Sequence, residues 1–345
     1  KRLSTSAPGR HTKKANRLFT KAISDEVRDD DLIWVHDYNL MLLPEMLRKV
    51  WARSKQSVKV GFFLHTPFPS REIYRILPVR NGILLGVSHC GITGLHTYDY
   101  TRHFLTIVRV YCEWTREGCL SMGLMQCGLD RTPNWIEIQG RVVTCSSIGI
   151  NPNKFKEILR KENDQKRIAG WNKSSRASSS SLVLSVWTTL RNAAEAACVG
   201  GLSKCQPTLS ANLPWVGKVV NRRTKPTRCR RVSKPAAVVN ESVGRIKGKF
   251  TTVEYMSIHF LYKSVNTHEL VALYAASNAL RRAPTRDVMN LMAYNYIASQ
   301  PEFDGGLCLS GFAGAAQSLN NDSVIFNPWR PVELASAYRE AVTMD

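Results

Sequence analysis

The stretch DLIWVHDYNLMLLPEMLRKV (31–50), followed by KVGFFLHTPFPSREIYRILP (59–78), decides the fold. Each segment begins with a continuous apolar or aromatic run, LIWV or VGFFL, which stops at a polar turn and then becomes helical in pattern. Continuous hydrophobicity is typical of parallel strands that are buried on both faces. Ligands of open α/β sheets bind beyond the carboxyl ends of such strands. His36, Asp37 and His65 occupy those positions, so the sequence predicts an α/β domain with a ligand site there.

Length, hydropathy and cysteine usage limit the class of protein. At 345 residues the chain is long enough for two domains. It has no apolar run of about 18 residues, which a membrane span would need. The N-terminal segment KRLSTSAPGRHTKKANRLF (1–19) is basic but lacks the apolar centre of a secretory signal. The nine cysteines form no C-x-x-C pair, which favours reduced thiols in a cytoplasmic protein over a zinc site or a disulfide framework.

The net charge of +21 is concentrated in the middle of the chain. Residues 151–250 hold 21 Lys or Arg against five Asp or Glu. Within them, NRRTKPTRCRRVSKP (221–235) has a composition that also occurs in nuclear-import signals and in phosphate-binding surfaces of nucleic-acid proteins. No aromatic residue is interleaved for base stacking. A solvated basic segment is therefore favoured, and nucleic-acid binding is the lesser alternative.

Patterning along the chain predicts two α/β domains. Alternating strand and helix patterns run through residues 31–155. A second series comprises an amphipathic helix at 268–280, strands at 305–310 and 323–327, and a helix with proline at its start at 331–342. The Ser-rich stretch NKSSRASSSS (172–181) reads as a linker. We therefore expect a domain at 1–155, a linker at 156–181, and a domain at 182–345 with an irregular basic insert at 187–237.

The middle of the second domain is internally inconsistent. LVLSV (182–186) and WVGKVV (215–220) have the composition of core strands, whereas residues 187–212 and 221–237 have neither a helical nor a strand period. We hypothesise that these two stretches come from a reading-frame error or a decayed gene. Sequencing of an intact transcript with this same frame would rule out the first explanation and leave genuine divergence.

Collinear segments of the chain resemble the trehalose-6-phosphate synthases. Besides the two stretches that decide the fold, they are GITGLHTYDYTRHFL (91–105), residues 129–155, residues 243–280, TRDVMNLMAYNYIASQ (285–300) and residues 311–344. The resemblance implies two facing Rossmann-like domains of the GT-B type, the first lacking its opening strands. It implies transfer of glucose from UDP-glucose to glucose 6-phosphate, with no cofactor. It also implies that ANRLFTKAISDEVRDDDLIWVHD (15–37) is mid-domain sequence.

For the first domain, the resemblance assigns Asp37 to the glucose 6-phosphate acceptor and His65 to the transferred glucose. A carboxylate there can accept hydrogen bonds from sugar hydroxyls. Alternatively, Asp37 caps the following helix and His65 is a satisfied core histidine. His89, His96 and His103 have no ligand spacing, and we expect His96 and His103 only to pack or cap.

For the second domain, the resemblance assigns Asp287 to hydroxyls of the donor glucose, and Met289, Asn290 and Leu291 to backbone contacts with the phosphates. Met292, Ala293 and Tyr294 are expected to belong to the same UDP-glucose site. A helix N-terminus with free N–H donors suits a diphosphate. Val265 aligns with a position whose backbone reads the uracil, and Asn295 with a glutamate that holds the ribose. No carboxylate pair with coordinating spacing accompanies this motif, so we expect no metal.

Three departures from the family pattern bear on activity. Val288 stands where the family has glycine, and a β-branched residue tolerates positive φ poorly. Asn295 is shorter than the glutamate that it replaces. The loop that carries an Arg/Lys pair for the diphosphate is absent after Val186. We therefore expect activity to be very low or lost, and the alternative is an inactive partner subunit of a trehalose synthase complex.

Overall fold

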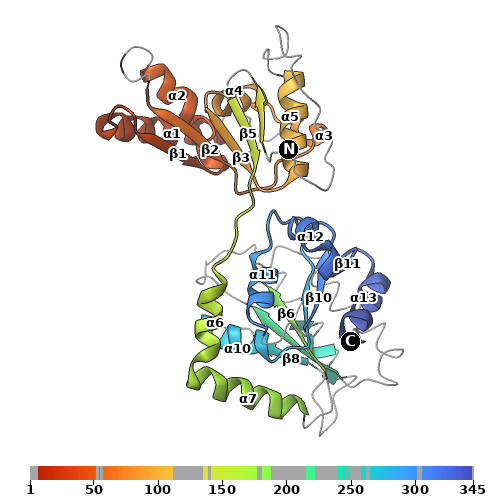
Figure 1. Ribbon diagram of the computed structural model, residues 1–345. Coiled ribbons are helices and arrows are strands. Elements are labelled where there is room, and N and C mark those ends of the chain that lie inside the picture. The colour runs from red at the N-terminus through yellow and green to blue at the C-terminus, as the bar shows by residue number, and fades with distance from the viewer. Residues whose placement is uncertain are drawn as a thin grey trace. The chain divides into compact units, whose positions relative to one another are not determined.

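The chain folds into two compact units, Lys1–Ile148 and Gly149–Asp345 (Figure 1). The computed structural model describes residues 7–51, 54, 57–111, 135–138, 141–176, 181–187, 215–221, 240–241, 243–245, 247–248, 258–261, 265–300 and 305–343. Each unit is built on a mainly parallel sheet with helices packed against it, so the predicted α/β class with two Rossmann-like units is confirmed. Within the described part of the chain, no helix combines the length and apolarity needed to cross a membrane.

The first unit contains a five-stranded sheet in the order β1-β2-β3-β5-β4. Its strands are β1 (Leu32–His36), β2 (Lys59–Phe63), β3 (Ile92–Leu95), β4 (Trp135–Ile138) and β5 (Arg141–Cys145), and only the β4–β5 pair is antiparallel. The helical elements are α1 (Ala7–Glu26), η1 (Tyr38–Leu40), α2 (Leu43–Val50), α3 (Arg71–Tyr74), α4 (Arg80–Ser88) and α5 (Tyr98–Tyr111). One hydrophobic core, which includes Val35, Phe62, Leu95 and Ile107, joins the sheet to these helices.

Strand β1 differs from the prediction of a fully buried strand. Leu32 is 61% exposed and Trp34 40% exposed, whereas Val35 is buried. The cause is position, because β1 is the end strand of the described sheet and pairs only with β2 there. Strand β2 lies between β1 and β3, and its segment VGFF is buried as predicted.

The second unit contains a six-stranded parallel sheet in the order β11-β10-β9-β6-β7-β8. Its strands are β6 (Ser181–Trp187), β7 (Trp215–Asn221), β8 (Ile258–Leu261), β9 (Ala279–Arg282), β10 (Gly306–Ser310) and β11 (Val324–Phe326). The helical elements are α6 (Pro152–Arg160), α7 (Glu162–Arg176), α10 (Thr267–Ala275), α11 (Leu291–Ala298), α12 (Ala315–Ser318), η3 (Asn320–Asp322) and α13 (Pro331–Thr343). Strands β6 and β7 confirm that the segments 182–186 and 215–220 form strands of this sheet.

Two sequence expectations for this unit need correction. The segment 268–280 is not one helix, because α10 ends at Ala275 and β9 begins at Ala279. Nor is α10 amphipathic, since its residues from Leu270 to Tyr274 are all buried.

The expected linker 156–181 holds the end of α6 and all of α7, within the second unit. Helix α7 is tied to α10 by an ion pair in which Asp164 Oδ2 lies 2.8 Å from His268 Nδ1. The irregular stretches 188–214 and 222–239, including most of the basic segment, lie outside the described residues.

Candidate functional site

Three histidines meet at the carboxyl edge of the first sheet. His36 ends β1, while His65 and His96 follow the ends of β2 and β3. The His36 Nδ1 atom lies 3.0 Å from His65 Nε2, and the two stacked rings have centroids 5.2 Å apart. The His96 ring centroid lies 5.7 Å from that of His65, and the Phe63 ring contacts both at 4.9 Å. The parallel register brings these side chains together, as expected for strand ends at one edge.

Asp37 lies at the same edge in a conformation that non-glycine residues rarely adopt. Its backbone has φ 67° and ψ 169°, a region populated almost only by glycine. The backbone N–H donates to the Phe63 carbonyl at 2.8 Å, which holds the turn against β2. The Asp37 side chain makes no capping bond to η1, so the alternative reading of a helix cap is wrong. Its buried Oδ1 finds no hydrogen-bond partner among the described residues.

His96 was expected only to pack or cap, but its ring lies against those of Phe63 and His65 at this edge. Its side chain is 1% exposed, and its Nδ1 finds no hydrogen-bond partner in the described part of the chain. Burial, reinforced by the neighbouring His65 and opposed by Asp37, lowers the pKa of His96 to about 4. At neutral pH it is therefore an uncharged imidazole. Its position directly after the third strand, ITGL, was the signal that could have identified it.

Asp287 lies beyond β9 at the carboxyl edge of the second sheet. Its backbone pairs with the loop after β10, because the Gly314 N–H donates to the Asp287 carbonyl at 3.1 Å. The Asn290 side-chain N–H donates to Asp287 Oδ2 at 3.1 Å. Burial raises the pKa of Asp287 above its ordinary value, although Arg282, the Val288 N–H and the Asn290 side chain oppose the shift. Asp287 thus lies in a partly desolvated site with a cation nearby.

The N-terminus of α11 already satisfies several of its own donors. Asn290 Oδ1 accepts hydrogen bonds from the N–H groups of Met292 at 3.2 Å and Ala293 at 3.4 Å. The Leu291 N–H donates to the Met289 carbonyl at 3.1 Å. A phosphate at this helix end would therefore compete with bonds that the chain makes to itself.

The remaining residues predicted for the UDP-glucose site are either buried or hydrogen-bonded within the second unit. Met292 and Ala293 are buried, and Tyr294 is hydrogen-bonded through its hydroxyl to Ser318 Oγ at 2.6 Å. The Asn295 carbonyl accepts a bond from Ser299 Oγ. Val288 is buried but not at positive φ, since Asp30 and Asp37 alone take positive φ among the described non-glycine residues. The expected backbone conflict at Val288 is therefore absent.

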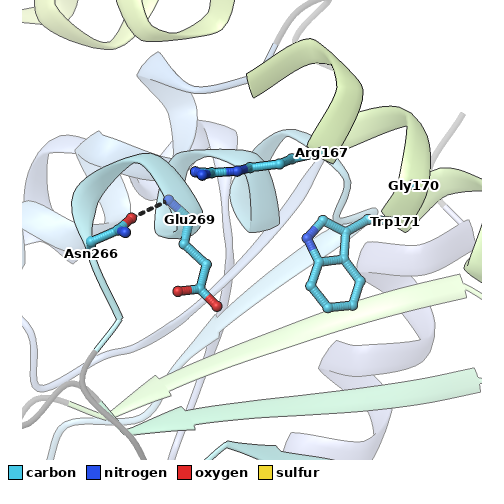
Figure 2. A pocket seen from close by; sticks show the side chains of 5 residues that line it. All are labelled: Arg167, Gly170, Trp171, Asn266 and Glu269. Atoms are coloured by element: carbon cyan, nitrogen blue, oxygen red, sulfur yellow. Dashed lines mark hydrogen bonds between the residues drawn. The ribbon is translucent and has the colours of Figure 1, made fainter. Parts of the chain in front are cut away.

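Val265 is 4% exposed and precedes the N-cap of α10. A hollow of about 510 Å³ lies next to it along the chain, lined by Arg167, Gly170, Trp171, Asn266 and Glu269. Figure 2 shows Arg167 and Trp171 extending from α7, and Asn266 accepting a 2.7 Å hydrogen bond from the Glu269 N–H. None of the predicted site residues is among the described residues that line this hollow.

The two sets of residues are thus each assembled within one unit. In the first unit, Asp37 and His65 lie at the same carboxyl edge, and the structure adds His36 and His96, whose rings contact that of His65. In the second unit, Asp287 and Asn290 are hydrogen-bonded at the start of α11. No group of three or more His, Cys, Asp or Glu side chains that could hold a metal ion occurs among the described residues.

The family model described as "Glycosyltransferase family 20" matches residues 9–345. An α,α-trehalose-phosphate synthase [UDP-forming] 1 from Aspergillus fumigatus is 53% identical over 337 residues, which cover 96% of this chain and 61% of that protein. The 56 kDa subunit of the corresponding synthase from Saccharomyces cerevisiae is 43% identical over 96% of this chain and 64% of its own length. The chain therefore spans less than two thirds of these curated relatives.

Solved structures show the same architecture. An α,α-trehalose-phosphate synthase (UDP-forming) from Burkholderia vietnamiensis superposes with a TM-score of 0.76 and 25% identity, over 97% of this chain and 69% of that one. A structure described as trehalose-6-phosphate from E. coli bound with UDP-2-fluoro glucose gives a TM-score of 0.77 and 25% identity, over 97% of this chain and 70% of that one.

Proposed function

The chain belongs to glycosyltransferase family 20, and from that premise we propose that it transfers glucose from UDP-glucose to glucose 6-phosphate, forming α,α-trehalose 6-phosphate and UDP. The observation that carries the proposal is the Asp37 edge of the first unit. Asp37 has a strained backbone and a buried carboxylate oxygen that finds no hydrogen-bond partner in the described part of the chain. It follows His36, which is hydrogen-bonded to His65 at the ends of parallel strands. Such backbone strain is found mainly at active sites and at positions that hold a ligand.

In the proposed reaction, Asp37 accepts hydrogen bonds from hydroxyls of glucose 6-phosphate, and His65 contacts the transferred glucose. The bond between the anomeric carbon and the UDP oxygen breaks, and the same carbon bonds to the anomeric oxygen of the acceptor. The acceptor hydroxyl proton passes to the departing diphosphate on the same face. No protein nucleophile is required, so the chain contributes positioning and charge stabilisation.

On the donor side, we assign Asp287 to hydroxyls of the glucose ring and the backbone of Val265 to the uracil. The segment Met289–Leu291 binds near the diphosphate, with Met292, Ala293 and Tyr294 continuing the same helix and Asn295 facing the ribose. Asn290 Oδ1 already accepts hydrogen bonds from the N–H groups of Met292 and Ala293 at the start of α11. In this scheme the diphosphate either displaces these hydrogen bonds or binds beside them. No cofactor or metal has a step in this scheme.

The experiment that tests the proposal is UDP release by the purified full chain with UDP-glucose and glucose 6-phosphate. We expect release that depends on the acceptor, together with trehalose 6-phosphate detected by mass spectrometry. The Asp37→Asn variant keeps the side-chain size and removes the charge, so it should lose most of the acceptor-dependent release. Absence of release from wild-type protein that circular dichroism shows to be folded would contradict the proposal.

A second candidate function is that of an inactive partner subunit of a trehalose synthase complex in the cytoplasm. It is favoured by the occupied N–H groups of α11 and by the replacement at Asn295. The Saccharomyces cerevisiae relative is itself named as a subunit. A folded chain with no turnover that co-purifies with an active synthase would support this candidate. A monomer with family-like turnover would eliminate it.

A further inference from the structure

Two consecutive arginines lie buried on a central strand of the second sheet. Arg281 is 2% exposed and Arg282 3% exposed, at the end of β9, which pairs with β6 on one side and β10 on the other. Arginine is almost never fully buried unless it is paired, because removing its charge from water is costly. Consecutive burial of two such residues therefore needs a reason.

The two side chains serve opposite faces of the sheet, as neighbouring residues of a strand do. Leu280, on the face that Arg282 shares, packs in the core with Met292, Ala293 and Tyr296 of α11. Ala279 packs on the other face with Cys308 and with Leu334 of α13. Arg281 acts electrostatically on Cys308, which agrees with that second face. Arg282 therefore belongs to the α11 face.

Arg282 also lies at the carboxyl end of its strand, where ligands of parallel sheets bind. It stabilises the ionised form of Asp287, the residue that follows the same strand end and bonds to the α11 cap. Its Nε and Nη1 atoms are buried without a hydrogen-bond partner among the described residues. The buried Arg282 guanidinium thus acts on Asp287, whose side chain is hydrogen-bonded to Asn290, the N-cap of the eight-residue helix α11.

We propose that Arg282 binds the diphosphate of the nucleotide-sugar donor at the start of α11. The inference rests on the proposed function, because it names a residue for the same donor site. A guanidinium offers planar, paired donors that match phosphate oxygens. The helix N–H groups at this end are occupied by Asn290 and Met289, so the arginine supplies donors where the backbone does not. An anionic ligand also offsets the cost of the buried charge.

Titration calorimetry of the full chain with UDP, and separately with inorganic pyrophosphate, tests the assignment. We expect Arg282→Met to weaken UDP binding about 10- to 100-fold, since a charged hydrogen-bonding group is lost. Arg282→Lys should recover part of the affinity, because it keeps the charge but not the planar fork. Arg281→Met is the matched control: it removes an equally buried arginine from the opposite face and should leave UDP affinity within about twofold.

Thermal melting without ligand separates a binding role from a structural one. The Nε and Nη1 atoms of Arg282 are buried without a hydrogen-bond partner among the described residues, so its removal should leave the melting temperature of Arg282→Met unchanged or higher. A purely structural Arg282 would give the reverse result, a lower melting temperature with unchanged UDP affinity, and would overturn the proposal. Failure of the folded wild-type chain to bind UDP and pyrophosphate would also overturn it.

The outcome is independent of turnover, because UDP binding requires no acceptor. A chain that binds UDP through Arg282 but releases none from UDP-glucose would contradict the proposed transfer and keep this inference. If the chain has full transfer activity but Arg282→Met binds UDP as tightly as the wild type, the proposed transfer is supported and this inference is overturned.

Discussion

The carboxyl edges of the two sheets have the same topology but different chemistry. In the first unit, parallel strands end in the imidazoles of His36, His65 and His96, and His96 is held neutral by burial. In the second unit, the strand end carries the buried cation Arg282 beside Asp287. Neutral hydrogen-bonding groups suit sugar hydroxyls, whereas a guanidinium suits phosphate oxygens. The difference indicates that the residues at the strand ends, rather than the shared fold, set which ligand chemistry each edge suits.

The largest expected effect comes from removing the imidazole at the centre of the first edge. His65→Ala should lower acceptor-dependent UDP release about 100- to 1,000-fold, the usual cost of one preorganised group at a reacting centre. Binding of UDP alone should not change, because UDP lacks the glucose that His65 contacts in the proposed scheme. His89→Ala is the control, because the His89 ring bonds to the Leu85 carbonyl of the preceding helix, and no hydrogen bond or ring contact joins it to the edge among the described residues. Equal loss of UDP affinity in His65→Ala would break the division between the two edges.

The next prediction uses the neutral state of His96. Its pKa is about 4 in the folded chain against an ordinary value of 6.5, so between these values the unfolded state binds the extra proton. The free energy of unfolding should therefore fall as the pH is lowered from about 6.5 to about 4, by at most on the order of 3 kcal/mol. Urea denaturation of wild-type protein and His96→Gln across this range measures the difference. Parallel pH profiles for the two proteins would contradict the buried neutral imidazole.

Much of this architecture could be predicted from the sequence because strand burial leaves a plain signal. The runs at β2, β6 and β7 were recognised as core strands, and the polar residues after β1 and β2 marked the edge that holds Asp37 and His65. The prediction failed where burial depends on neighbours. Strand β1 has the composition of a central strand but lies at the end of the described sheet. Helix α7 has few apolar residues and is held by contacts with α10, such as the Asp164–His268 pair.

The residues that the sequence missed share a physical cause. His96 follows a strand whose register with β2 brings its ring to His65, and register cannot be read from one segment. Arg282 has a charge that normally indicates a surface position, and only the packing of both sheet faces buries it. The cap formed by Asn290 on α11 depends likewise on where the helix begins.

A smaller effect is expected at that cap. Asn290→Ala removes the bonds to the Met292 and Ala293 N–H groups and the bond to Asp287, which should cost about 1 kcal/mol of stability. Asn266→Ala removes the same kind of cap from α10, and serves as the matched control. Both variants should lose similar stability in urea denaturation, but only Asn290→Ala should alter donor KM, because it alone contacts Asp287. Identical donor KM in both variants would remove Asn290 from the donor edge.

The smallest effect is expected from a substitution at Val288. This residue is buried next to Asp287 and donates its backbone N–H to the Asp287 carboxylate. Because Val288 has no positive φ, glycine is not required by the backbone, and Val288→Gly should lose roughly 1 kcal/mol of stability through greater freedom of the unfolded chain. Removal of the side chain also lets a diphosphate approach the backbone more closely, so UDP affinity should rise about two- to fivefold. Calorimetry with UDP measures that gain. If affinity instead stayed constant while stability fell, the side chain at residue 288 would serve only the core, and the donor edge would depend on Arg282 and Asp287 alone.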